Sequence, residues 1–316
     1  MGLKSVVLNS ERMNYDGKLD LSVLSSEVKE YASTEQDQIL ERVQGMDVVV
    51  TKEMPVDGDT IARFPDSVQL ICEAGTGYNN IDIEAARARG ITVCNIPAYS
   101  TERVAHTAIM MILNLSSSMQ IQQAMLARGD RSNFTKCMQV SHVEVNGKVL
   151  GVVGAGTIGR EVIKVAQALG MKVLAYTRTP RADEDNLKYV SLEELLKQSD
   201  YISLHCPLTP QTRHMINKET IAMMKPTAYI INTGRGALID EPALIEALKE
   251  GRIAGAGLDV QETEPPVQNN PLYDMPNVIL TPHMGWKGLE TRQRLVSILA
   301  ANIQAFDEGR PQNVVS

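Results

Sequence analysis

Short apolar runs alternate with longer amphipathic stretches along almost the whole chain. Runs rich in β-branched residues predict strands at residues 6–8, 47–51, 69–72 and 92–94. Similar runs predict a second series of strands at residues 149–154, 172–176, 201–204, 228–232, 257–260 and 278–281. Strands that alternate with helices are typical of parallel sheets covered by helices on both faces. The pattern therefore predicts an α/β fold with two doubly wound parallel sheets.

Two long helical stretches mark the boundaries of these two units. Residues 100–128 are rich in Ala, Met and Ile and connect the two series of strands, and residues 289–308 follow the last strand. Because so little sequence follows the second series, we expect the chain to return to the first unit. This interpretation predicts one domain at residues 101–284, inserted into another that comprises residues 1–100 and 285–316.

A glycine-rich segment follows the first strand of the inserted domain. Residues 154–159 read GAGTIG, a GxGxxG motif between an apolar strand and an amphipathic helix. Gly154 permits a tight turn, Gly156 lets the backbone approach a pyrophosphate, and Gly159 lets the helix pack closely on the strand. Free N–H groups at the helix start favour phosphate. The motif predicts a Rossmann-like dinucleotide-binding domain. The other domain is then expected to bind the substrate. The alternative is a glycine-rich turn that binds no ligand.

The end of the next strand bears on the choice between NAD and NADP. NAD sites of this kind place an acidic residue there to hold the ribose 2′-hydroxyl. Here Thr177 and Arg178 follow the strand, without a carboxylate. A guanidinium can pair with a 2′-phosphate, which an Asp would repel. We therefore favour NADP, with NAD as the alternative cofactor, although Arg178 could also be a solvated loop cation.

Three later strands each lead into a segment with a charged or titratable side chain. Arg235, Glu264 and His283 each follow one of the predicted strands. The carboxyl ends of parallel strands share one edge of the sheet, and ligands bind there. Each of the three residues alone could be an ordinary surface or turn residue. Together, behind a dinucleotide motif, they are expected to converge beside the cofactor.

These three side chains suit the reduction of a 2-oxo acid. A histidine exchanges protons near neutral pH, so His283 can protonate the carbonyl oxygen when hydride reaches the carbon. Glu264 can hold one imidazole nitrogen and favour the charged ring. Arg235 can bind the carboxylate and polarise the carbonyl through its fork of donors. The nicotinamide cofactor supplies the hydride. The combination predicts an oxidoreductase that acts on a small anionic 2-oxo or 2-hydroxy acid.

The amino-acid composition limits which binding partners and which cellular location are expected. The 316 residues carry a net charge of −7, which argues against nucleic acid and anionic membranes as partners. An anionic substrate stays compatible, because a site can be locally positive. The four cysteines form no CxxC pair, and no His, Cys or Asp cluster has ligand spacing, so we expect no metal. The sequence shows no signal peptide and no apolar run near 18 residues, so the cytoplasm is the expected location.

Several segments resemble those of the D-isomer-specific 2-hydroxyacid dehydrogenases, in particular the glycerate dehydrogenase (hydroxypyruvate or glyoxylate reductase) branch. They are GTGYNNID at 75–82, NIPAYST at 95–101, the glycine motif, HCPL at 205–208, NTGRG at 232–236 and TPH at 281–283. The resemblance covers nearly the whole chain. It implies conversion of hydroxypyruvate or glyoxylate to D-glycerate or glycolate, with Arg235, Glu264 and His283 as the catalytic set.

The resemblance also implies residues that bind the two ligands. The backbone amides of Thr76 and Gly77 would hold the substrate carboxylate, and Trp286 would close the substrate site, which also includes Arg235 and His283. The cofactor would contact Gly154, Gly156, Thr157, Ile158, Gly159, Thr177, Arg178, Cys206, Pro207, Thr233, Arg235, Asp259, His283 and Gly285. One departure is VAHTA at 104–108, where family members usually read Val-Ala-(Glu or Gln)-His-Thr, so no contact is transferred there.

Two alternatives stay open at this point. A transcriptional co-regulator that senses the dinucleotide can use the same fold and keep the same three residues. Such relatives usually carry long disordered tails, and no such tail is evident here, so we expect an enzyme. A homodimer is also expected, because the stretch 100–128 is apolar over much of its surface; burial of this stretch within one chain is the alternative.

Overall fold

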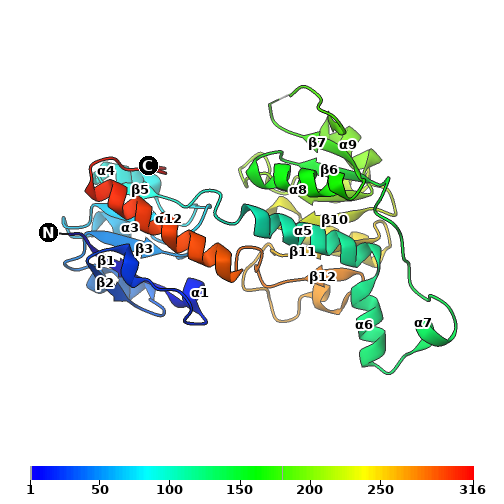
Figure 1. Cartoon of the computed structure of the whole chain (residues 1–316), viewed down its shortest axis with the longest axis horizontal. Helices are drawn as coiled ribbons and strands as arrows, with labels where there is room; N and C mark the ends of the chain where they lie inside the picture. Colours follow the sequence, from blue (N-terminus) through cyan, green and yellow to red (C-terminus); the bar gives the residue numbers. More distant parts are fainter. Residues whose placement is uncertain (1, 180) are drawn as a thin grey trace. The chain divides into compact units, whose positions relative to one another are not determined.

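The computed structural model describes residues 2–179 and 181–316, and the chain divides into two compact units (Figure 1). Unit 1 comprises Met1–Ser100 and Trp286–Ser316, and unit 2 comprises Thr101–Gly285. Unit 2 is thus inserted into unit 1. Each unit has its own sheet and its own apolar core, so each is described by itself.

Unit 1 is built on a parallel sheet with the strand order β2-β1-β3-β4-β5. Its strands are β1 (Lys4–Val7), β2 (Glu27–Glu30), β3 (Val48–Thr51), β4 (Leu70–Glu73) and β5 (Thr92–Cys94). Its helices are α1 (Glu11–Asn14), α2 (Ile39–Arg42), α3 (Gly58–Ala62), α4 (Ile83–Ala88) and α12 (Leu289–Asp307), with 3-10 turns at Ser22–Leu24 and Gln36–Gln38. β3 and β4 are buried along their whole length, because α12 packs on one face of the sheet and α2, α3 and α4 pack on the other.

Unit 2 is built on a larger parallel sheet with the strand order β12-β11-β10-β9-β6-β7-β8. Its strands are β6 (Val149–Val153), β7 (Lys172–Tyr176), β8 (Leu187–Tyr189), β9 (Tyr201–Leu204), β10 (Tyr229–Asn232), β11 (Gly255–Leu258) and β12 (Val278–Leu280). Its helices are α5 (Thr101–Ser116), α6 (Met119–Ala127), α7 (Ser132–Thr135), α8 (Thr157–Ala168), α9 (Leu192–Gln198), α10 (Lys218–Ile221) and α11 (Glu241–Lys249), with 3-10 turns at Gly236–Leu238 and Pro271–Asp274. α5 and α8 cover one face of the sheet, while α9, α10 and α11 cover the other.

The strand order of unit 2 bears on where a ligand would bind. β7 pairs with one side of β6, and β9 pairs with the other, so the order of the strands changes direction at β6. Ligands of open α/β sheets bind at the carboxyl ends of the strands beside such a switch. The predicted fold class, with two doubly wound parallel sheets, is confirmed.

The structure differs from the sequence prediction in three elements. The stretch 100–128 forms two helices, α5 and α6, rather than one. The break falls at Ser118, whose backbone is left-handed (φ 47°) and whose hydroxyl donates to Ser141 O at 2.7 Å. Serine side chains that bond to the backbone compete with helix formation. The sequence pattern also does not predict β2, which is polar and largely exposed, or β8, which has only three residues.

The two helices of this stretch differ in burial. α5 buries its apolar face in the core of unit 2 through residues such as Ala105, Ala108 and Met111. α6, in contrast, has no buried residue. Over the part of the chain that the structure describes, no helix has both the length and the apolar character required to cross a bilayer.

Candidate active site

The glycine motif of unit 2 forms a tight turn between β6 and α8. Gly154 has a left-handed backbone (φ 99°), and a Cβ there would lie 2.7 Å from the Cys206 N atom. A Cβ at Gly159 would lie 2.0 Å from the Gly154 carbonyl oxygen. Both positions therefore require glycine, the first for the loop after β9 and the second for the helix. At Gly156 no atom lies within 4 Å of the Cβ position, so space for a ligand stays open.

The start of α8 offers donors to an anion. Gly156 is the N-cap and provides no side chain for the first N–H groups of the helix. Within residues 2–179 and 181–316, no acceptor is bonded to the N–H groups of Thr157 or Ile158. The aligned peptide dipoles of this 12-residue helix add partial positive charge at the same end. This geometry fits the diphosphate of a dinucleotide.

Other polar groups along this sheet edge also fit a dinucleotide. Thr233, after β10, is 7% exposed, and its hydroxyl has no hydrogen-bond partner among the described residues. Buried hydroxyls normally form a hydrogen bond, and a bound ligand would provide the partner that this hydroxyl lacks among the described residues. After β7, the Thr177 hydroxyl donates to Thr179 O at 2.7 Å. Arg178 is exposed and pairs with no residue that the structure describes.

Arg235 lies between β10 and the 3-10 turn at Gly236–Leu238. Asn232 fixes this loop, because its Nδ2 donates to Arg235 O at 2.9 Å and its Oδ1 accepts from Gly234 N at 3.0 Å. The Arg235 guanidinium donates to Gly234 O at 2.9 Å. It has no carboxylate partner in the described part of the chain. A partly buried guanidinium without a counter-charge is suited to an anionic ligand.

Gly236 brings the loop after β10 against the loop after β11. A Cβ at Gly236 would lie 1.9 Å from Gln261 O and 2.5 Å from Glu262 N. Any side chain at this position would collide with backbone atoms, which cannot rotate away. The close approach therefore depends on glycine, and it places the Arg235 segment beside the segment that leads to Glu264.

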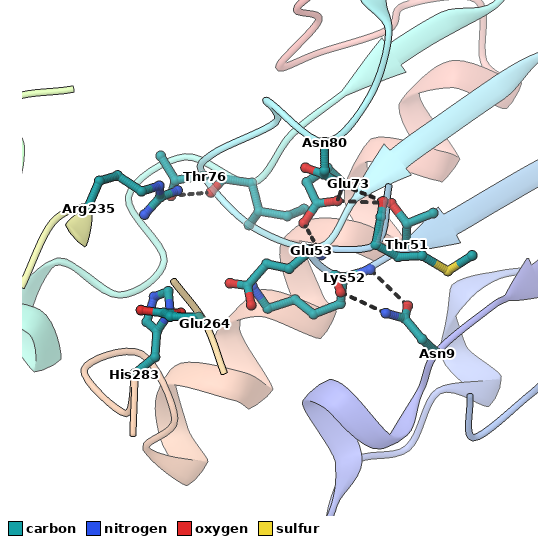
Figure 2. Close-up of polar contacts among 12 residues, drawn as sticks. Asn9, Thr51, Lys52, Glu53, Glu73, Thr76, Asn80, Arg235, Glu264 and His283 are labelled. Carbon is teal, nitrogen blue, oxygen red and sulfur yellow. Dashed lines mark hydrogen bonds and ion pairs between the residues drawn. The ribbon is translucent and has the colours of Figure 1, made fainter. Parts of the chain in front are cut away.

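His283 and Glu264 form a pair at the same edge of unit 2 (Figure 2). The His283 Nδ1 and Glu264 Oε2 atoms are 2.8 Å apart. The second carboxylate oxygen, Oε1, accepts from Gln261 N at 3.0 Å, which fixes the orientation of the carboxylate. His283 Nε2 has no partner among residues that the structure describes. The carboxylate thus holds one side of the ring and leaves the other nitrogen available for a ligand.

Asp259 anchors the loop that carries His283. This carboxylate is 1% exposed, and it accepts from Met284 N at 2.9 Å and from Gly285 N at 2.7 Å. Its main-chain oxygen accepts from His283 N at 2.9 Å. His283 adopts a left-handed backbone (φ 49°), which non-glycine residues rarely do. These bonds hold the loop in that conformation, so Asp259 positions the imidazole.

In unit 1 the segment after β4 also leaves backbone donors open. Gly75 O accepts from Ile96 N at 2.9 Å, and Thr76 O accepts from Asn95 Nδ2 at 2.7 Å. The Thr76 hydroxyl donates to Ile96 O at 2.9 Å. No acceptor in the described residues is bonded to the N–H groups of Thr76 or Gly77. A loop with its carbonyls bonded elsewhere and its N–H groups open is suited to bind an anion.

Comparisons with known proteins agree with this geometry. The model of the D-isomer specific 2-hydroxyacid dehydrogenase, NAD binding domain, matches residues 109–285. A hydroxypyruvate reductase of Blautia hydrogenotrophica is 40% identical over 287 residues, which cover 90% of this chain and 89% of the relative. The chain belongs to the D-isomer specific 2-hydroxyacid dehydrogenase family. It is therefore an oxidoreductase that uses a nicotinamide cofactor.

Further relatives match this dehydrogenase over nearly its full length. A glycerate dehydrogenase of Methylorubrum extorquens is 42% identical over 294 residues, 92% of each chain. The crystal structure of a glyoxylate reductase from Paecilomyes thermophila matches with a TM-score of 0.86 at 32% identity, and covers 99% of this chain and 98% of that one. The resemblance found in the sequence is confirmed, and these relatives favour an enzyme over a transcriptional co-regulator.

A buried polar cluster in unit 1 of the dehydrogenase is not evident from the sequence (Figure 2). Glu73, the last residue of β4, is fully buried. Its carboxylate accepts from Thr51 Oγ1, Asn80 Nδ2 and Glu53 N, each at 2.9 Å. Burial raises the pKa of Glu73, while these donors and the nearby Lys52 oppose that effect. The only signal in the sequence is a charged residue directly at the end of an apolar strand.

Lys52 and Trp286 belong to the same cluster. Lys52 follows β3 and is 2% exposed, and its Nζ lies 2.6 Å from Glu53 Oε1. The ammonium also lies 4.2 Å from the centre of the Trp286 ring. Trp286 is 5% exposed within the core of unit 1, and its indole N–H has no partner among the described residues.

The loop after β9 carries neutral side chains. The Cys206 thiol contacts Met215 Sδ at 3.6 Å, and burial raises its pKa to about 11, so the thiol stays protonated at neutral pH. The His205 Nε2 and Ser203 Oγ atoms are 2.7 Å apart, and burial lowers the pKa of His205 to about 4. Pro207 is exposed. No cluster of three or more His, Cys, Asp or Glu in the described part of the chain could hold a metal ion.

Proposed function

We propose that this dehydrogenase reduces a small 2-oxo acid to the D-2-hydroxy acid, most directly hydroxypyruvate to D-glycerate and glyoxylate to glycolate. The observation that carries the proposal is the His283–Glu264 pair, which lies at the same sheet edge as Arg235, a residue with no carboxylate partner among those the structure describes. The relatives named hydroxypyruvate reductase, glycerate dehydrogenase and glyoxylate reductase support these two substrates.

His283 is the proposed acid and base. Its open Nε2 gives a proton to the substrate carbonyl oxygen in the reductive direction and takes it back from the hydroxyl in the oxidative direction. Glu264 accepts from Nδ1, which fixes the orientation of the ring and directs Nε2 towards the proposed substrate. When bound, the reduced nicotinamide supplies the hydride for the carbonyl carbon.

The carboxylate of the substrate requires fixed donors. Arg235 offers a planar fork of N–H groups, which can bind a carboxylate with two parallel hydrogen bonds and polarise the neighbouring carbonyl. In unit 1 the open N–H groups of Thr76 and Gly77 are a second set of donors for a carboxylate. Trp286 is proposed to form a wall of the substrate site, since its indole N–H has no acceptor within the described part of the chain.

One steady-state experiment tests the proposed reduction of 2-oxo acids and the role of His283 as the general acid. The wild-type protein is assayed with glyoxylate, hydroxypyruvate, pyruvate and phenylpyruvate against NADH and NADPH. His283→Asn removes the proton donor at similar size and should lower kcat by about 100-fold or more, since a general acid contributes this order. His142→Asn, at an exposed histidine, is the matched control. Cofactor affinity, measured by fluorescence titration, should stay within about threefold; a His283→Asn variant that keeps a tenth of wild-type kcat contradicts the assignment.

We propose NADP as the preferred cofactor, with NAD also accepted. Thr177 and Arg178, not a carboxylate, directly follow β7, and Arg178 is exposed and unpaired among described residues, as a 2′-phosphate partner requires. Arg178→Ala should raise the KM for NADPH by about tenfold and leave that for NADH within twofold. Arg181→Ala, at another cation of the same exposed loop, is the matched control. Thr177→Asp should shift the preference towards NADH, and an unchanged NADPH-to-NADH ratio in both variants argues against the proposal.

We also propose a homodimer held by residues 119–143, the segment that contains α6 and α7. This segment exposes large apolar side chains on a chain whose other apolar residues are mostly buried. They are Met119, Leu126, Phe134, Met138 and Val143. Phe134 is 76% exposed, which is costly unless a second copy covers it. Light scattering should give a dimer for the wild type and a monomer, or weakened dimer, for Phe134→Asp, with the exposed Tyr273→Asp as control. A monomeric wild type overturns the proposal.

A further inference from the structure

A buried lysine in unit 1 has no role in the reaction as described so far. Lys52 is 2% exposed, although a lysine is rarely buried without a specific partner. Its ammonium has one hydrogen-bond acceptor among the described residues, Glu53 Oε1 at 2.6 Å, and faces the Trp286 ring. An ammonium has three N–H donors, so part of its donor capacity is not used.

The position of this ammonium relates it to the loop that follows β4. A Cβ built on Gly75 would lie 3.1 Å from Lys52 Nζ and 3.2 Å from Glu73 Oε1. The absence of a side chain at Gly75 therefore allows close contact between the loop and the lysine. The next two residues, Thr76 and Gly77, are those whose N–H groups are open. The positive charge thus lies against Gly75, the residue directly before the two whose N–H groups form the proposed carboxylate site.

Two carboxylates near Lys52 would disfavour the binding of an anion if the ammonium were absent. Glu53 and Glu73 are both close to Lys52, so without the ammonium two carboxylates would face the loop. The N–H groups of the loop carry only partial charges and cannot offset these carboxylates by themselves. Glu53 also adopts a left-handed backbone (φ 56°), a conformation that non-glycine residues rarely keep without a functional constraint.

We propose that Lys52 is the charge-selecting residue of the substrate site: its ammonium beneath Gly75 makes the open N–H groups of the loop prefer a carboxylate to an uncharged group of the same shape. The inference rests on the proposed function and deepens it, because it assigns the preference for 2-oxo acids over their amides or aldehydes to one residue. Lys52 acts through the loop and is a positioning residue.

The test compares a charged and an uncharged substrate of nearly equal shape. Wild type, Lys52→Met and the exposed control Lys29→Met are assayed with glyoxylate and with its amide, glyoxylamide, at saturating cofactor. Lys52→Met should raise the KM for glyoxylate by about tenfold or more, with kcat within about threefold, because a charge that acts equally on ground and transition states changes KM. The kcat/KM for glyoxylamide should change by less than about threefold, as should both substrates in Lys29→Met.

A second variant covers the possibility that Lys52→Met does not fold. Glu53→Gln removes a negative charge beside the ammonium and should increase the preference for glyoxylate over glyoxylamide by about threefold. Equal losses on both substrates in Lys52→Met, or an unchanged preference in a folded Glu53→Gln, overturn the inference and indicate a structural role. A wild-type protein that reduces no 2-oxo acid would instead overturn the proposed function, so the two failures are distinguishable.

Discussion

Gly236→Ala is the sharpest test of the idea that two loops of unit 2 assemble the catalytic residues. The Cβ of alanine would lie 1.9 Å from Gln261 O, whereas real Cβ atoms essentially never come closer than 3.0 Å. The two loops must therefore separate by at least about 1 Å. One of them carries Arg235, and the other leads to Glu264, the partner of His283.

A displacement of this size has a measurable cost. A misplacement of about 1 Å in catalytic geometry lowers turnover by about 100-fold, so we expect this loss in kcat/KM for glyoxylate. The overpacked backbone contact should also lower the free energy of unfolding by about 1–3 kcal/mol. The assay follows the absorbance of the reduced cofactor, together with thermal unfolding monitored by circular dichroism.

Gly234→Ala is the matched control, two residues earlier in the same loop. Its Cβ would have its nearest neighbour, Leu204 O, at 3.4 Å, which is ordinary van der Waals contact. This variant should keep kcat/KM within about threefold of the wild type. If Gly236→Ala keeps comparable activity, or if Gly234→Ala is equally damaged, the close approach of the two loops does not determine the catalytic geometry.

Three further predictions follow from single contacts. Arg235→Lys keeps the charge but loses the planar fork, so kcat/KM for glyoxylate should fall by about tenfold or more, measured beside an unchanged cofactor affinity. His205 has a pKa lowered to about 4 by burial, so the unfolded chain takes up a proton first and stability is lost as pH falls from about 6.5 towards 4. Urea unfolding should show a loss of about 3 kcal/mol over this window, and His205→Gln should remove it. The hydrogen bond from Arg292 lowers the pKa of Asp16 to about 2, so its contribution is present above about pH 4 and is lost on further acidification; Asp16→Asn should flatten the melting temperature between pH 4 and 3.

The parts of the fold that could be predicted from sequence are those fixed by local pattern. β7 and β9 have the predicted bounds, because each is an apolar run that ends at a polar or glycine-rich turn. The glycine motif was also readable, since its context between strand and helix is local. The exposed strand β2 was not, because its polar residues pair only when β1 is already present beside them.

The candidate site also has parts that could be predicted from the sequence and parts that could not. The His283–Glu264 contact was predictable because parallel strands bring their carboxyl ends to one edge, whatever the side chains between them. The Lys52 cluster was not, since its members come from separate strands and loops and their burial depends on packing across the sheet. A charged residue at a strand end is more often exposed, so its sequence position alone does not reveal a buried role.

In both units a loop leaves backbone N–H groups open, but the source of the nearby positive charge differs. In unit 2 the glycine turn leads directly into α8, whose uncapped start supplies open N–H groups and a helix dipole. In unit 1 the loop after β4 leads into no such helix: α4 begins only at Ile83, has six residues, and the side chain of Asp82 caps it. The partial charges of a few loop amides then need a full charge beside them. Burial of an ammonium is costly, and a neighbouring carboxylate and an aromatic ring offset that cost. In the proposed substrate site of unit 1, the buried lysine therefore supplies the positive charge that the start of α8 supplies in unit 2.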